Sequence, residues 1–232
     1  MNKNIFLFLL ALIVANSAYA KDCVVLLHGL AKSDRDMAKI AHKLSEEGYK
    51  TVNFDYQSTS GTIEKLSSSV ITSSLKQCGS FEQVHFVTHS MGGLLVRHYL
   101  AQGTIDRLGR VVMLGPPNKG SEAVDAYRNF PGFYTIGGPA GLQLGTGKMS
   151  VPKKLGTVDF ELGVIAGTRS VNLILSSILP GKDDGKVTVE STKVDGMDDH
   201  IAMPVTHPFM MKNKYVIKQV VHFLKTGKFY RT

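Results

Sequence analysis

The feature that most constrains the fold is a serine placed between a strand-like segment and a helix-like segment. Residues 83–88 favour a strand, Ser90 follows, and Gly92 leads into the apolar helical run 94–100. A strand that turns sharply into a helix exposes a serine hydroxyl at the end of a sheet, an arrangement called a nucleophile elbow. Small residues are needed two positions either side of the serine. Gly92 meets this need, whereas Thr88 occupies the position where glycine is usual.

Strand-like and helix-like segments alternate along the whole chain. The strands are expected at residues 23–28, 51–55, 83–88, 110–114, 160–166 and 200–206. Apolar residues at helical spacing mark helices around residues 37–44, 63–70, 91–102 and 216–224. This alternation predicts one α/β domain over residues 21–232, with a mostly parallel sheet and helices on both faces. Ligands then bind at the carboxyl ends of the strands, where the glycine- and proline-rich segment 116–155 is expected to shape a pocket.

The first twenty residues are typical of a signal peptide. Lys3 supplies the positive charge, residues 5–15 form a short apolar run, and Ala18-Tyr19-Ala20 is a small-residue cleavage pattern. We therefore expect a mature chain that begins near Lys21 and is exported to the periplasm or secreted.

The chain contains two cysteines, Cys23 and Cys78. In an exported protein this number suggests one disulfide. If the strands beginning near these residues are parallel neighbours, their starting ends lie side by side and a bridge is feasible. Two free thiols remain the alternative, and neither cysteine lies at the end of the sheet where the chemistry is expected.

The formal net charge is +8, and basic residues gather near the C-terminus. They are Lys212, Lys214, Lys218, Lys225, Lys228 and Arg231. One interpretation is attraction to an anionic membrane surface. The favoured interpretation is the solvated face of a final helix. No sequence motif for nucleic-acid binding accompanies the charge, so we expect no nucleic-acid partner.

Ser90 needs a base and an orienting acid, because a serine hydroxyl is a weak nucleophile near neutral pH. In enzymes built on this elbow, the acid and then the histidine follow the serine in the chain. His98 and His222 fall inside helices and are expected to be packing or surface residues. His207 follows the last predicted strand at its carboxyl end and is favoured over His200, which lies at its beginning.

The acid is expected in the loop after the fifth predicted strand. Asp184 precedes Gly185, and a glycine turn can direct a carboxylate at an imidazole, so Asp184 is favoured and Asp183 is second. Asp195, Asp198 and Asp199 are the remaining candidates.

The oxyanion of an acyl-transfer transition state needs two backbone donors. We expect one from Met91, which directly follows the serine, and one from Leu30 in the loop after the first strand. Gly29 lets this loop approach closely. His28 is expected to brace the loop, because it precedes the serine in the chain.

Taken together, these motifs resemble a bacterial α/β-hydrolase of the lipase and esterase class, close to the small secreted triacylglycerol lipases. The matching segments are 25–30, 88–93, 115–121, 183–187 and His207 before the last helix. The resemblance implies Ser90, Asp184 and His207 as the catalytic triad, with Leu30 and Met91 as oxyanion donors. It also implies hydrolysis of an ester or lipid, without a metal or organic cofactor and with a minimal lid or none. We expect the protein to be a monomer.

Two other functions use the same sequence features. An acyltransferase would need the same triad but would pass the acyl group to an alcohol or amine. A non-catalytic binding protein would keep the pocket but would be expected to lack one member of the triad. This sequence contains a candidate for each of the three members.

Overall fold

The structure, a computed structural model, describes residues 21–171 and 176–231. The predicted signal peptide, residues 1–20, lies outside the described residues. Among the described residues, no helix has the length and apolar character that crossing a membrane would need.

The centre of the molecule is a parallel sheet of six strands in the order β2-β1-β3-β4-β5-β6. The strands are β1 (Cys23–Leu27), β2 (Lys50–Phe54), β3 (Val84–His89), β4 (Leu108–Leu114), β5 (Leu162–Gly167) and β6 (Asp199–Met203). Strands β1, β3 and β5 are buried along their whole length. Their continuous apolar runs are those of strands covered on both faces. The predicted parallel sheet is therefore confirmed.

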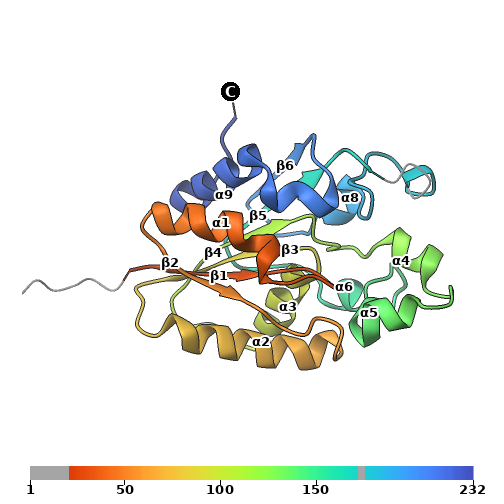
Figure 1. The fold of residues 1–232 in the computed structure, drawn as a ribbon, viewed down its shortest axis with the longest axis horizontal. Coiled ribbons are helices and arrows are strands. Elements are labelled where there is room, and N and C mark those ends of the chain that lie inside the picture. Colours follow the sequence, from red (N-terminus) through yellow and green to blue (C-terminus); the bar gives the residue numbers. More distant parts are fainter. Residues whose placement is uncertain (1–20, 172–175, 232) are drawn as a thin grey trace, which may run out of the picture.

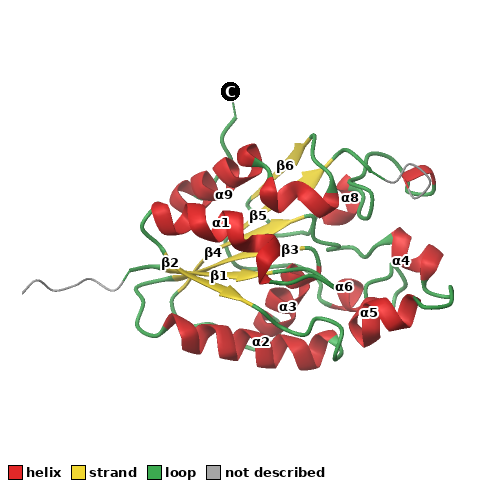
Figure 2. Ribbon diagram, viewed as in Figure 1, coloured by secondary structure: helices red, strands yellow, loops and turns green. Residues whose placement is uncertain are grey.

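Helices cover both faces of this sheet, as Figures 1 and 2 show. Helices α1 (Asp34–Glu46) and α9 (Lys214–Thr226) lie on one face, and α2 (Ile63–Cys78) and α3 (Met91–Leu100) lie on the other. Each helix buries an apolar stripe, which produces one hydrophobic core on each side of the sheet.

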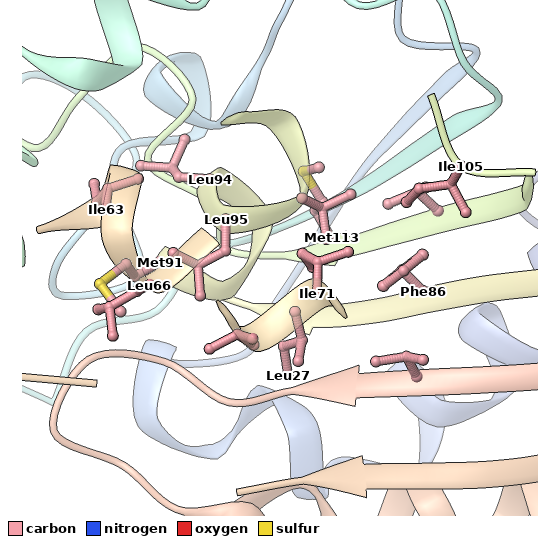
Figure 3. Packing of buried hydrophobic residues seen from close by; sticks show 14 of the residues in the cluster. Leu27, Ile63, Leu66, Ile71, Phe86, Met91, Leu94, Leu95, Ile105 and Met113 are labelled. Atoms are coloured by element: carbon pink, nitrogen blue, oxygen red, sulfur yellow. The ribbon is translucent and has the colours of Figure 1, made fainter. Parts of the chain in front are cut away.

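The core beneath α2 and α3 positions the elbow. Figure 3 shows Leu27, Phe86 and Met113 of the sheet in one cluster with Ile71 of α2 and Leu95 of α3. All five side chains are fully buried. Because α3 begins directly after the serine, this packing fixes the direction in which the chain leaves the elbow.

Strand boundaries differ from the sequence prediction by up to three residues, and two of these differences have a clear local cause. Strand β6 ends at Met203 rather than residue 206, because Pro204 has no N–H for the ladder and the Val205 N–H turns back to the Met203 carbonyl. Strand β4 begins at Leu108, which pairs with Val84; Gly109, which has no side chain to pack, hid this start in the sequence.

Cys23 and Cys78 form a disulfide, with a Cα–Cα distance of 5.9 Å. Cys23 begins β1, Cys78 is the last residue of α2, and both are fully buried. The predicted pairing is confirmed, and it lies at the amino ends of the strands.

Three short helices lie beyond the carboxyl ends of the strands (Figure 1). They are α4 (Glu122–Tyr127), α5 (Phe133–Leu142) and α6 (Val151–Lys154). Helix α5 is interrupted at Gly138, where φ is +60° and an added Cβ would collide with the backbone of Thr59. The segment between β4 and β5 is thus built of short helices, and the expectation of a minimal lid or none stays a prediction.

Three of the six basic residues named near the C-terminus form ion pairs. Lys225 contacts Glu47, Lys212 contacts Asp36, and Arg231 contacts Asp199. Helix α9 turns its apolar residues inward. This arrangement supports the favoured interpretation, a solvated helix face.

Candidate active site

Ser90 occupies the turn between β3 and α3. Its φ of 52° and ψ of −123° are rare for a residue with a side chain. Such a conformation costs on the order of 1–3 kcal/mol and persists only where the surroundings impose it. Here the ladder to β4 continues into the turn, because the Ser90 N–H donates to the Leu114 carbonyl at 2.8 Å. The strained turn has the backbone geometry predicted for a nucleophile elbow.

The glycines after the serine make this turn possible. A Cβ on Gly92 would lie 2.8 Å from the Leu27 carbonyl oxygen and 2.9 Å from that of His28. A Cβ on Gly93 would lie 3.2 Å from Thr88 Oγ1. Thr88 is fully buried, so the space that Gly93 leaves empty helps to accommodate the side chain that replaces the usual glycine.

Three predicted residues meet in a chain of hydrogen bonds. Ser90 Oγ lies 3.1 Å from His207 Nε2, and His207 Nδ1 lies 2.7 Å from Asp184 Oδ2. Asp184 is fully buried, and His207 is 4% exposed. This is the geometry of a serine, a base and an orienting acid.

The loop after β5 holds Asp184 in one orientation. Its Oδ1 accepts hydrogen bonds from the backbone N–H groups of Lys186 at 3.0 Å and Val187 at 2.9 Å. Its carbonyl accepts the His207 N–H at 2.9 Å. Asp184 Oδ2, the other carboxylate oxygen, is therefore free to accept the hydrogen bond from His207 Nδ1–H. Gly115 packs against this pair, where an added Cβ would lie 3.0 Å from Asp184 Oδ2.

The other candidates lie away from Ser90 or face other partners. Asp183 accepts from the Ser176 hydroxyl and the Gly185 N–H. His200 Nε2 contacts Thr192 Oγ1 at 3.0 Å. Asp198 accepts from the Leu162 N–H, Asp199 binds Arg231, and the Asp195 carbonyl accepts from the Val158 N–H.

The two predicted oxyanion donors flank the serine. Met91 is the first residue of α3, where an N–H has no intrahelical partner, and its side chain is buried in the core (Figure 3). Leu30 lines the cavity that contains Ser90. Within the described part of the chain, neither N–H makes a hydrogen bond.

The loop that carries Leu30 is held in place by contacts between His28 and Tyr56. The Tyr56 hydroxyl donates to the His28 carbonyl at 2.6 Å, and the two rings stack with centroids 4.1 Å apart. Burial raises the pKa of Tyr56, which keeps its phenol protonated as a donor. The predicted bracing role of His28 is confirmed.

His89, next to the serine, belongs to the site although the sequence analysis gave it no role. It is 1% exposed, and its Nε2–H donates to the His207 carbonyl at 3.0 Å. Burial and the neighbouring His207 hold the pKa of His89 well below its usual range, so the ring stays neutral. Its position beside Ser90 was the only available signal, because the contact joins residues far apart in the chain.

A cavity of about 670 Å³ opens at Ser90 and His207. Its wall includes Val124 and Tyr127 of α4 and Ile136 of α5, together with other apolar residues of the segment between β4 and β5. This size is within the range of small-molecule sites. The prediction that segment 116–155 shapes the pocket is confirmed, and the site can hold an apolar ligand against the serine.

Solved structures of other proteins share this fold. The mature lipase BlEst2 of Bacillus licheniformis superposes with a TM-score of 0.68 at 21% identity, covering 88% of this chain and 92% of that one. A structure described under LipS and LipT, two metagenome-derived lipolytic enzymes, gives 0.63 at 14% identity, covering 89% and 94%. A lipase-esterase related protein of Clostridium acetobutylicum gives 0.57 at 13% identity, covering 87% and 94%.

Comparison with curated proteins finds no match to this chain. The family model described as the alpha/beta hydrolase fold, in contrast, matches residues 22–166. This range is more than half of the chain and contains the elbow and the loop after β1. The chain belongs to the α/β hydrolase fold family.

Proposed function

We propose that the protein is a serine hydrolase of carboxylic esters, of the lipase or esterase type, which works through an acyl-enzyme. The observation that carries this proposal is the continuous hydrogen-bonded chain from Ser90 through His207 to Asp184, open to an apolar cavity. The likeness to lipases and lipolytic enzymes in fold supports the same class of substrate.

In the proposed reaction, the Ser90 oxygen attacks the ester carbonyl while His207 Nε2 takes its proton. Asp184 accepts the Nδ1–H of the imidazolium and stabilises its charge. The N–H groups of Leu30 and Met91 stabilise the developing oxyanion. The alcohol leaves with the proton from His207. Water, deprotonated by the same histidine, then releases the carboxylic acid and restores the serine.

The first test is labelling with a fluorophosphonate, which reacts with activated serines. We expect one adduct, mapped by mass spectrometry to Ser90, and none in Ser90→Ala. Turnover of a short-chain ester should fall roughly a thousandfold or more in this variant, with an almost unchanged melting temperature, because only one hydroxyl is removed.

The matched control is Ser69→Ala, which removes an exposed serine of α2 and should keep both labelling and turnover. No adduct on the folded wild-type protein would favour the non-catalytic binding protein. Product analysis with an added alcohol separates the hydrolase from the acyltransferase, since an ester product would reveal acyl transfer.

We also propose that the chain is exported after cleavage near residue 20, as a periplasmic or secreted monomer. The disulfide supports this location, because such bonds persist in oxidising compartments. Sequencing the N-terminus of the protein recovered outside the cytoplasm is the test, and an uncleaved chain would contradict it.

A further inference from the structure

The cavity at Ser90 has two chemically different parts. Helices α4 and α5 and their connection contribute an apolar wall, which includes Tyr127, Phe130 and Phe133. Lysines contribute the other part: Lys32 from the loop after β1, and Lys186 from the loop that carries the acid. A ligand that fills the whole cavity would therefore need an apolar portion and an anionic portion.

Lys32 is only weakly compensated by protein carboxylates. Its ammonium lies 3.8 Å from Asp36 Oδ1, close to the limit for an ion pair. The ammonium of Lys212 lies nearer to the same oxygen, at 3.5 Å. Two cations thus share one carboxylate, and Lys32, which lines the cavity, keeps positive charge that this carboxylate does not compensate.

Lys186 is held in place by its backbone while its charge is left unpaired. Its N–H donates to Asp184 and its carbonyl accepts from the Ser121 hydroxyl. Among the residues that the structure describes, no carboxylate lies within ion-pair distance of its ammonium. Although part of the side chain is exposed, burial lowers the pKa of Lys186 and repulsion from Lys32 lowers it further, whereas the charge of Asp184 raises it.

Both ammonium groups influence the pKa of His89, the residue directly before Ser90. Repulsion from Lys186 and from Lys32 adds to the burial and the His207 interaction that lower the pKa of His89. Lys32, Lys186 and Ser90 line one cavity, so a ligand that fills this cavity can meet both cations and the serine.

We propose that Lys32 and Lys186 bind a phosphate group of the substrate, so that the preferred ester is a carboxylic ester of a phosphorylated alcohol. A phosphate monoester carries up to two negative charges and can compensate both ammonium groups, whereas a carboxylate compensates one. The acyl chain would then lie against the wall from α4 and α5. This inference rests on the proposed ester hydrolysis; the phosphate is bound and its own bonds stay intact.

The test uses two water-soluble substrates that differ only in the phosphate: dibutyroylglycerol and dibutyroylglycerol phosphate. Both are used as monomers, so attraction to a lipid surface does not contribute. We expect the wild type to prefer the phosphate ester in kcat/KM. In Lys32→Gln/Lys186→Gln this preference should fall at least tenfold, whereas Lys32→Arg/Lys186→Arg should keep most of it.

The matched control is Lys214→Gln/Lys218→Gln, which removes two exposed charges from α9 and should keep the wild-type preference. A preference that survives the glutamine pair, or a wild type that prefers the uncharged ester, would overturn the inference.

Binding of dibutyroylglycerol phosphate to Ser90→Ala, measured by calorimetry, separates the two proposals. Suppose that Ser90→Ala binds the phosphate ester, that adding the two glutamine substitutions abolishes this binding, and that the wild type hydrolyses neither ester. These results would contradict only the proposed hydrolysis. Hydrolysis of dibutyroylglycerol without lysine-dependent binding of the phosphate ester would contradict only this inference.

Discussion

At the scale of single residues, the site depends on close approaches that only glycine permits. Gly92 brings α3 against the carbonyl oxygens at the end of β1, and Gly29 brings the next loop against the elbow, where an added Cβ would lie 3.1 Å from Ser90 Cβ. These contacts place the loop of Leu30 beside the nucleophile. The glycines therefore determine the distance between the serine and one proposed oxyanion donor.

We predict that Gly92→Ala destabilises the protein by about 1–3 kcal/mol, because the added methyl group meets backbone oxygens that cannot move aside freely. Ester turnover should fall as well, since the elbow must shift. Denaturant unfolding measures the first effect. Gly103→Ala is the control, because nothing lies within 4 Å of its added Cβ. Equal stability of the two variants would contradict the prediction.

At the scale of elements, the disulfide connects the first strand to the second helix. Cys23 begins β1 and Cys78 ends α2, so the bond closes a loop across a sequence separation of 55 residues. The bond lies at the amino ends of the strands, whereas Ser90 lies at the carboxyl ends. It therefore restrains the unfolded chain without touching the proposed chemistry.

We predict that Cys23→Ala/Cys78→Ala lowers the free energy of unfolding by about 3–4 kcal/mol, as expected for closure of a loop of this length. Turnover by the folded variant should stay within a few-fold of the wild type at low temperature. A reducing agent should destabilise the wild type and leave the variant unchanged. A large loss of turnover in the folded variant would show that the bond also positions the site.

At the scale of the whole molecule, three histidines are held neutral by their surroundings. Burial lowers the pKa of His85 and His200, and burial together with His207 lowers that of His89. Below the usual histidine pKa, the unfolded chain binds protons at these positions that the folded chain does not bind. Stability therefore falls as the pH falls through about 6.5.

We predict that the free energy of unfolding decreases from pH 7.5 to pH 5, by at most about 1.4 kcal/mol per pH unit for each such histidine. Denaturant unfolding at several pH values measures this slope. His200→Gln, which cannot take up a proton, should show a shallower slope. A stability that does not change over this range would contradict the prediction.

Much of the fold follows from local patterns. The continuous apolar runs of β1 and β3, and the inward residues of α1 and α9, are visible in sequence because burial on one or both faces selects them directly. The boundaries at Pro204 and Leu108 were less well predicted, because they depend on pairing with a neighbouring strand.

By itself, the sequence determined the alternating strands and helices, the elbow at Ser90, and a histidine and an acid placed after it in the chain. Local propensity and chain order contain this information. Only the tertiary structure decided between Asp184, which the sequence favoured, and Asp183. It also showed that His89 contacts His207, and which residues of the segment between β4 and β5 line the cavity. Neighbouring carboxylates have the same local chemistry, and what separates them is contact with residues far away in the chain.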